Sequence, residues 1–112
     1  MKSNKNADIP NKTRYQGAGN YFVLILHDVE AYPAWKYVFD DAREIRKRAG
    51  ELSYQLLKHD HDENQIAHFS EWTSLDNARR FFESSELIEI RKKAGVKMPS
   101  FIYLEQIEHA KL

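Results

Sequence analysis

Two histidines, His27 and His68, occupy segments of alternating apolar and polar residues, where proton transfer is the chemistry that they could perform. Imidazole titrates near pH ~6.5, so it can accept and return a proton at neutral pH. Side chains two residues apart in a strand share a face, which places His68 on the same side as Trp72. Each histidine is therefore a candidate general base. The alternatives are a hydrogen-bonded core or barrel-face residue for His68 and a strand-end residue near solvent for His27.

Aromatic side chains make up 12% of the chain and could line a flat binding site. Aromatic residues spaced along one side of a helix or strand also fit an ordinary hydrophobic core. One residue can serve both purposes, because a pocket wall is part of the core. A small hydrophobic or aromatic ligand is the partner that this composition favours. The candidate binding residues are Trp35, Phe39, Tyr54, Trp72, Phe81, Phe82 and Tyr103.

Several other kinds of chemistry are excluded or disfavoured. The chain has no Cys, which excludes disulfides, thiolate nucleophiles and iron–sulfur ligands. The run His59–Asp62 offers four metal-ligating side chains, but it falls in an expected hairpin turn, so we predict a solvated turn and no metal site. Basic and acidic residues are equal in number, 17 each, which argues against nucleic acid or an anionic membrane as a partner. Gly-rich phosphate loops and Ser nucleophile motifs are absent from the sequence.

The length of 112 residues fits a single domain. Residues 1–20 are polar and include Pro10, so we expect a flexible N-terminal tail before a single domain over residues 21–112. The longest apolar run, Tyr21 to Leu26, is too short to cross a bilayer, and the first twenty residues lack the apolar core of a signal peptide. We therefore expect a cytoplasmic protein that does not enter a membrane.

The periodicity predicts the element order β–α–β–β–α–β. Pro33 suits the first position of the first helix, and Gly50 suits its end. Ser74 suits the N-cap of the second helix, Ser84-Ser85 interrupts that helix, and Gly95 suits its end. This order is that of a ferredoxin-like α+β fold, a four-stranded antiparallel sheet with two helices on one face. The predicted strands are 21–29, 52–59, 65–72 and 100–107, with a hairpin turn over 60–64 and helices over 33–49 and 75–94.

The strand 21–29 is apolar on both faces, although two helices can cover only one face of a sheet. Phe69, Ile102 and Leu104 add further apolar surface to the sheet. A monomer would leave this face in water, and soluble proteins rarely tolerate a large patch of this kind. We therefore predict a homodimer that packs sheet against sheet.

Four segments of the chain resemble the antibiotic biosynthesis monooxygenase-like domain of the dimeric α+β barrel superfamily. They are Trp35–Phe39, Phe69–Ser74, Ala78–Ser84 and Glu86–Val96, and the resemblance extends over about Tyr21 to Glu108. It implies a pocket between the sheet and the helices of each subunit, and a barrel formed by the other sheet faces of two subunits. Trp72 matches a pocket residue of the haem-degrading members.

The family includes cofactor-independent monooxygenases of polycyclic phenols and anthrones, quinol monooxygenases, haem-degrading enzymes and members with no known activity. The haem-degrading members use a His in the second helix as the iron ligand and an Asn on the first strand. The matching positions here are Arg91 and Val23 or Ile25, so the resemblance implies no cofactor. We expect cofactor-independent oxygenation of an aromatic or quinol-like molecule with His68 or His27 as base. The alternative is a non-catalytic, small-molecule-binding or stress-related dimer of the same fold.

Overall fold

The structure, a computed structural model, describes residues 20–97 and 99–112. The predicted tail over residues 1–20 lies outside this part of the chain except for Asn20. The predicted order of strands and helices is confirmed, with each helical region divided into two segments. The elements are β2 (Tyr21–Asp28), α2 (Tyr32–Asp41), α3 (Arg43–Ala49), β3 (Glu51–His59), β4 (Asp62–Trp72), α4 (Leu75–Phe82), α5 (Ser85–Lys93) and β5 (Ser100–Glu105).

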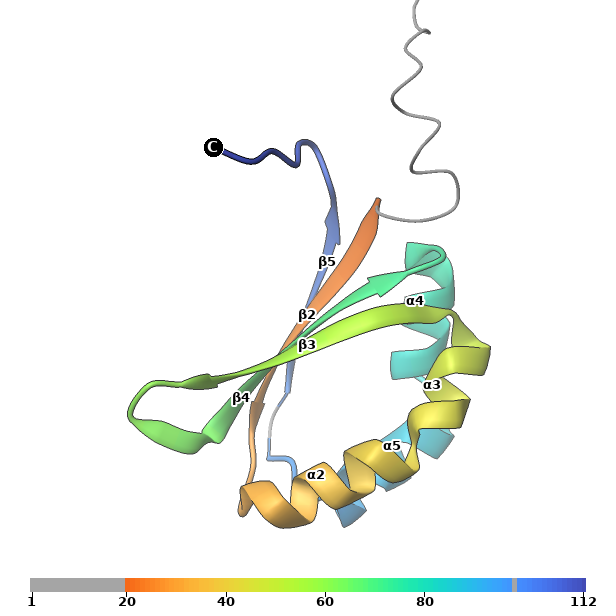
Figure 1. The fold of residues 1–112 in the computed structure, drawn as a ribbon. Coiled ribbons are helices and arrows are strands. Elements are labelled where there is room, and N and C mark those ends of the chain that lie inside the picture. The colour runs from red at the N-terminus through yellow and green to blue at the C-terminus, as the bar shows by residue number, and fades with distance from the viewer. Residues whose placement is uncertain (1–19, 98) are drawn as a thin grey trace, which may run out of the picture.

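The four described strands form one antiparallel sheet in the order β3-β4-β2-β5, with helices α2 to α5 on one face (Figure 1). β2 lies between β4 and β5, so its residues pair on both sides. Ile25 is paired with His68 of β4 and with Phe101 of β5, and His27 is paired with Ile66. The ferredoxin-like α+β fold predicted from the sequence is therefore confirmed.

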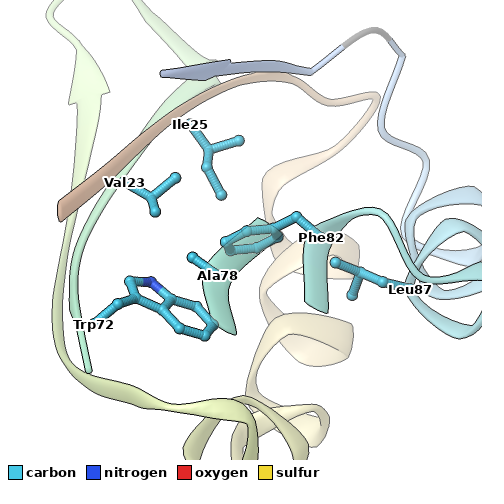
Figure 2. Close-up of a cluster of buried hydrophobic side chains, with 6 residues drawn as sticks. All are labelled: Val23, Ile25, Trp72, Ala78, Phe82 and Leu87. Atoms are coloured by element: carbon cyan, nitrogen blue, oxygen red, sulfur yellow. The ribbon is translucent and has the colours of Figure 1, made fainter. Parts of the chain in front are cut away.

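Alternation in the strands separates two faces of the sheet. The face toward the helices carries buried residues at every second position, such as Val23 and Ile25 in β2 and Ile66 and Trp72 in β4. Figure 2 shows how Val23, Ile25 and Trp72 meet side chains of α4 and α5. The opposite side, which we call the open face, carries Phe22, Leu24, Leu26, Leu57, Ala67, Phe69, Ile102 and Leu104.

The first helical region is divided at Ala42, where the prediction of one continuous helix was wrong. Ala42 donates its N–H to the carbonyls of both Val38 and Phe39. The Arg46 guanidinium also donates to the Phe39 carbonyl, so a buried side chain competes for an acceptor that a regular helix uses internally. No Gly, Pro or Ser stands there to indicate the break in the sequence.

The predicted caps are confirmed. Ser74 accepts a hydrogen bond from the Asn77 N–H at 3.0 Å, and Ser84 accepts one from Leu87 at 3.2 Å, so the second helical region ends and begins again at Ser84. Gly50 has a φ of 125°, a region that favours glycine. The hairpin between β3 and β4 is shorter than the predicted turn over 60–64, because β4 already begins at Asp62.

None of the helices in the described residues is long and apolar enough to cross a membrane.

Candidate active site

A cavity of about 60 Å³ lies between the sheet and the helices, where the two buried hydrophobic clusters of the protein meet. Strands β2, β4 and β5 contribute its sheet side, and helices α2 to α5 contribute its other walls. Most of the lining is apolar, and the polar residues that reach it are two histidines and two arginines. The lining consists of Ile25, His27, Trp35, Val38, Phe39, Ala42, Arg46, His68, Phe81, Phe82, Leu87, Ile90, Arg91, Ala94, Val96 and Phe101.

His68 belongs to a buried chain of charged and polar groups. Its Nε2 lies 2.8 Å from Oε2 of Glu51, and Oε1 of the same carboxylate accepts from Arg46 Nε at 2.7 Å. The side chains are almost fully enclosed, with His68 2%, Arg46 4% and Glu51 8% exposed. A carboxylate can remain charged at such a depth because a cation and a second donor both bind it.

Aromatic rings hold this chain in place. The His68 ring meets Phe39 edge-on at 5.0 Å and Tyr54 at 5.8 Å between ring centroids. The Arg46 guanidinium lies over the Phe39 ring, 3.7 Å from its centroid. These contacts restrict the orientation of the imidazole. Glu51 restricts which ring nitrogen carries the proton, because an Nε2–H that donates to Glu51 leaves the lone pair of Nδ1 as the proton acceptor.

His27 has a different environment, although its ring centroid is 6.4 Å from that of His68. It packs against Trp35 at 5.3 Å, and neither ring nitrogen has a hydrogen-bond partner among the described residues. Burial, followed by the charges of His68 and Arg91, lowers the pKa of His27 to about 3. His27 is therefore neutral at physiological pH, with one N–H donor and one acceptor nitrogen.

Arg91 reaches the cavity from α5. Its guanidinium donates to the Phe82 carbonyl at 3.1 Å and lies 5.1 Å from the Phe101 ring centroid. Partial burial lowers the pKa of this guanidinium, which remains a cation at neutral pH. Within residues 20–97 and 99–112 no carboxylate forms an ion pair with Arg91.

The cavity brings together most of the site residues predicted from the sequence. Both candidate bases line it, as do four of the seven candidate binding residues: Trp35, Phe39, Phe81 and Phe82. Tyr54 is outside the lining but touches it through its contacts with Phe39 and His68. Tyr103 lies elsewhere, with Arg79 over its ring.

Trp72 lies behind the cavity wall. It is fully buried, its Nε1 donates to Ser70 Oγ at 2.7 Å, and its ring packs against Phe81 and Phe82 at 5.8 and 5.2 Å between centroids. Figure 2 shows Trp72 together with Phe82. Trp72 therefore supports two rings that do line the cavity. A direct contact between Trp72 and a ligand requires Phe81 or Phe82 to move.

Arg46, Glu51 and Arg91 are site residues that the sequence did not indicate, and both arginines stand in basic runs that were expected to be solvated helix surface. Arg46 stands in a run of basic residues near a helix end, a pattern typical of a solvated surface, and Glu51 follows the glycine that ends the helix. Their pairing joins α3 to the start of β3 across five residues, which neither helical nor strand periodicity indicates. A Glu immediately before an apolar strand was the available signal.

No group of three or more His, Asp or Glu side chains in the described part of the chain is placed to hold a metal ion. In the His59–Asp62 run the two histidines lie near Asp60, at 3.5 and 3.4 Å, and all three side chains are exposed.

The cavity combines an imidazole that can accept a proton with walls formed largely by apolar and aromatic side chains. His68 is hydrogen-bonded to a carboxylate, and His27 beside it is a neutral donor and acceptor. Such a site is suited to removing a proton from a weakly acidic aromatic molecule.

No protein-family profile matches this chain, and no curated protein matches its sequence. Solved structures do match its fold. SnoaB, a cofactor-independent oxygenase from Streptomyces nogalater, is 15% identical with a TM-score of 0.68, over 80% of this chain and 95% of that one. A predicted antibiotic biosynthesis monooxygenase from Bordetella bronchiseptica is 18% identical with a TM-score of 0.68, over 80% and 99%.

A dimeric ferredoxin-like protein from an uncultured marine organism is 12% identical with a TM-score of 0.60, over 89% of this chain and 98% of that one. The chain therefore has the fold of antibiotic biosynthesis monooxygenase-like structures, as the sequence resemblance predicted. At these identities the likeness concerns the fold, and the chemistry has to be argued from the side chains of the cavity.

Proposed function

We propose that the protein is a cofactor-independent monooxygenase acting on an aromatic or quinol-like small molecule. The observation that carries this proposal is the buried His68–Glu51 pair at the wall of a cavity enclosed by aromatic rings. Likeness in fold to SnoaB, described as a cofactor-independent oxygenase, supports it.

The proposed reaction needs a base, a pocket that excludes water, and an electron-rich substrate anion that meets dioxygen there. His68 accepts the acidic proton of the substrate, and the resulting carbanion or phenolate is electron-rich enough to reduce dioxygen. For an anthrone-type CH₂ group, one oxygen atom becomes the new carbonyl oxygen and the other leaves as water with both hydrogens. Atoms and electrons balance with the substrate as reductant and dioxygen as oxidant. Glu51 is a positioning residue, because it orients His68 and stabilises the imidazolium that forms.

The size of the cavity imposes a condition on this reaction. A space of about 60 Å³ is smaller than the ~150 Å³ cavity that accommodates benzene, so an aromatic substrate has to separate helices from the sheet on entry. The division of both helical regions, at Ala42 and at Ser84, provides places where the helices can bend. We expect binding to be accompanied by movement of these helices.

Oxygen consumption with a panel of anthrones and hydroquinones tests the catalytic proposal. We expect His68→Ala to lower kcat by about 10² or more, the usual contribution of a positioned base. Glu51→Gln, which retains an acceptor for His68, should give a smaller loss confined to kcat with KM preserved. The matched control is His59→Ala, at an exposed histidine outside the cavity. Full activity of His68→Ala on a substrate that the wild type oxidises would refute the role of His68.

A non-catalytic binding protein is the second candidate, favoured by the small and mostly apolar cavity. In that case the histidines and Glu51 would be a structural network and an aromatic ligand would bind without oxygen consumption. Ligand binding in the absence of turnover across the whole panel distinguishes this function from the first.

We further propose that the protein functions as a homodimer that packs through the open face. Exposed Leu26, Leu57, Ile102 and Leu104 support this assembly, since water would otherwise contact them. The described dimeric ferredoxin-like neighbour also supports it.

A further inference from the structure

Three buried side-chain nitrogens in the described residues lack any hydrogen-bond partner, and all three belong to residues that line the cavity. They are Nδ1 and Nε2 of His27 and Nη2 of Arg46. His27 and Arg46 are more than nine-tenths buried, at 8% and 4% exposed. Buried polar atoms are nearly always paired, so unpaired ones concentrated at one cavity indicate a partner that enters it.

The chemistry of these nitrogens determines the partner. Arg46 already uses Nε for Glu51 and Nη1 for the Phe39 carbonyl, so Nη2 is a donor that remains after the structural bonds are made. His27, neutral at physiological pH, offers an N–H. Two elements, β2 and α3, therefore each bring an unpaired donor to the lining of the same cavity, and an oxygen acceptor is the group that satisfies both.

The charge balance of the cavity walls favours an anion. Arg46 is neutralised by Glu51, whereas Arg91 has no carboxylate partner among the described residues. The Arg91 guanidinium therefore adds to the cavity walls a positive charge that no carboxylate among the described residues compensates. An anionic oxygen group restores the balance in a site of low dielectric constant, where the attraction is strong.

We propose that the cavity binds its aromatic ligand through an anionic oxygen group, a carboxylate or phenolate, which accepts hydrogen bonds from His27 and from Arg46 Nη2 beside the cation of Arg91. The ring of the ligand lies among the aromatic side chains of Trp35, Phe39, Phe81 and Phe82. This proposal deepens the proposed function, because the same cavity would hold the substrate. Binding of such a ligand requires neither turnover nor His68 as base.

Benzoate and toluene are suitable probes, because they share one ring and differ in the anionic group. Titration calorimetry of the full chain at pH 7 should show benzoate binding at least tenfold more tightly than toluene. His27→Phe, which keeps an aromatic ring but removes both nitrogens, should weaken benzoate binding at least tenfold and leave toluene binding unchanged. Arg46→Lys, which keeps a cation for Glu51 but removes the planar fork, should weaken benzoate similarly. His27→Gln retains a donor and should lose less than His27→Phe.

The control is Arg48→Lys, at an exposed arginine of the same helix, which should bind benzoate like the wild type. Toluene binding as well as benzoate, or benzoate binding to both variants with wild-type affinity, would overturn the proposal. Failure of both probes to bind would also overturn it and indicate a cavity that holds water alone. The wild-type comparison decides the matter even where a variant fails to fold. Benzoate binding without oxygen consumption on any substrate would refute the catalytic function while preserving this inference.

Discussion

At the scale of single residues, two neighbouring histidines of one cavity have opposite electrostatic environments. His68 is bonded to a carboxylate that a buried arginine holds in place, whereas His27 has no partner among the described residues. The first environment suits a base that becomes an imidazolium during reaction, and the second suits a neutral group that contacts a ligand. Both residues are histidines, so the difference in their properties arises entirely from the side chains around them.

His27 should make the stability of the protein depend on pH. Its pKa falls from 6.5 in the unfolded chain to about 3 in the folded protein, so the unfolded chain binds more protons between these values. The contribution of neutral His27 to stability is therefore fully present above pH 6.5 and decreases as the pH falls toward 3. We expect His27 to account for a loss of roughly 2 kcal/mol in unfolding free energy between pH 7 and pH 5.

Urea denaturation at these two pH values, at one fixed protein concentration, measures this effect. His27→Phe should remove most of the difference between pH 7 and pH 5, and His61→Phe, at an exposed histidine, should leave it unchanged. An equal pH dependence in His27→Phe and the wild type would show that His27 is not responsible.

The sequence predicted that His68 shares a face of the sheet with Trp72, but it left open which face holds the two histidines. Alternation relates side chains along one strand, whereas the packing of the helices decides which set is buried, and in the structure both histidines lie on the helix-facing side. The partner of His68 could not be inferred, because Glu51 and Arg46 meet through a helix-to-strand junction whose geometry depends on tertiary packing. Trp72 illustrates the same limit: it was expected to line the pocket, but it packs against Phe81 and Phe82 and is not part of the cavity lining.

At the scale of elements, the junctions on either side of the sheet edge lock together. The Thr73 N–H donates to the Gly50 carbonyl at 2.9 Å, which ties the turn before β3 to the turn after β4. Gly50 has a φ of 125°, and a Cβ placed there would lie 2.5 Å from Thr73 Oγ1. This junction positions Glu51, the next residue of the chain, against Arg46 and His68.

Gly50→Ala should therefore destabilise the protein by roughly 2 kcal/mol or more, through backbone strain and the contact with Thr73. Gly95→Ala is the matched control, because its φ of 72° is near the left-handed region and a Cβ there would lie no closer than 3.4 Å to the Glu30 side chain. The control should cost about 1 kcal/mol. Urea denaturation of both variants compares them, and an equal loss would contradict the role assigned to the Gly50–Thr73 junction.

The helix ends show which features of an element can be read from a sequence. Ser74, Ser84 and Gly50 act through local hydrogen bonds or backbone conformation, so each was predictable from residue type. The break at Ala42 was not, because Arg46 takes part in it through a carbonyl seven residues earlier in the chain. Local chemistry is visible in the sequence, whereas side-chain competition across two turns is not.

At the scale of the whole molecule, the sheet has one face for the cavity and one face that no described element of the chain covers. The open face carries Leu26 and Leu57, 45% and 52% exposed, with Ala67 of β4 between them. Phe22 and Phe69 stack on this face at 5.1 Å between centroids. Burial of this apolar surface is the driving force that we assign to the homodimer.

The double variant Leu26→Lys with Leu57→Glu should convert the dimer to a monomer, because charged side chains at the centre of a packed interface lose their hydration. Sedimentation at micromolar concentration measures the change. Ile107→Lys is the control, since Ile107 is also exposed but lies beyond the end of β5. A wild-type protein that sediments as a monomer would defeat the dimer proposal directly.

The alternation of β2 determines which of its side chains reach the cavity, His27 among them. Positions 23, 25 and 27 face the helices, and Leu24 and Leu26 face the other way. A shift of this strand by one residue would exchange the two sets, placing leucines in the cavity and His27 on the open face. A single-residue deletion within β2 would thus preserve a sheet of similar composition while inverting its parity. The register of this central strand therefore decides whether its contribution to the cavity is purely aliphatic or includes a histidine that can exchange protons.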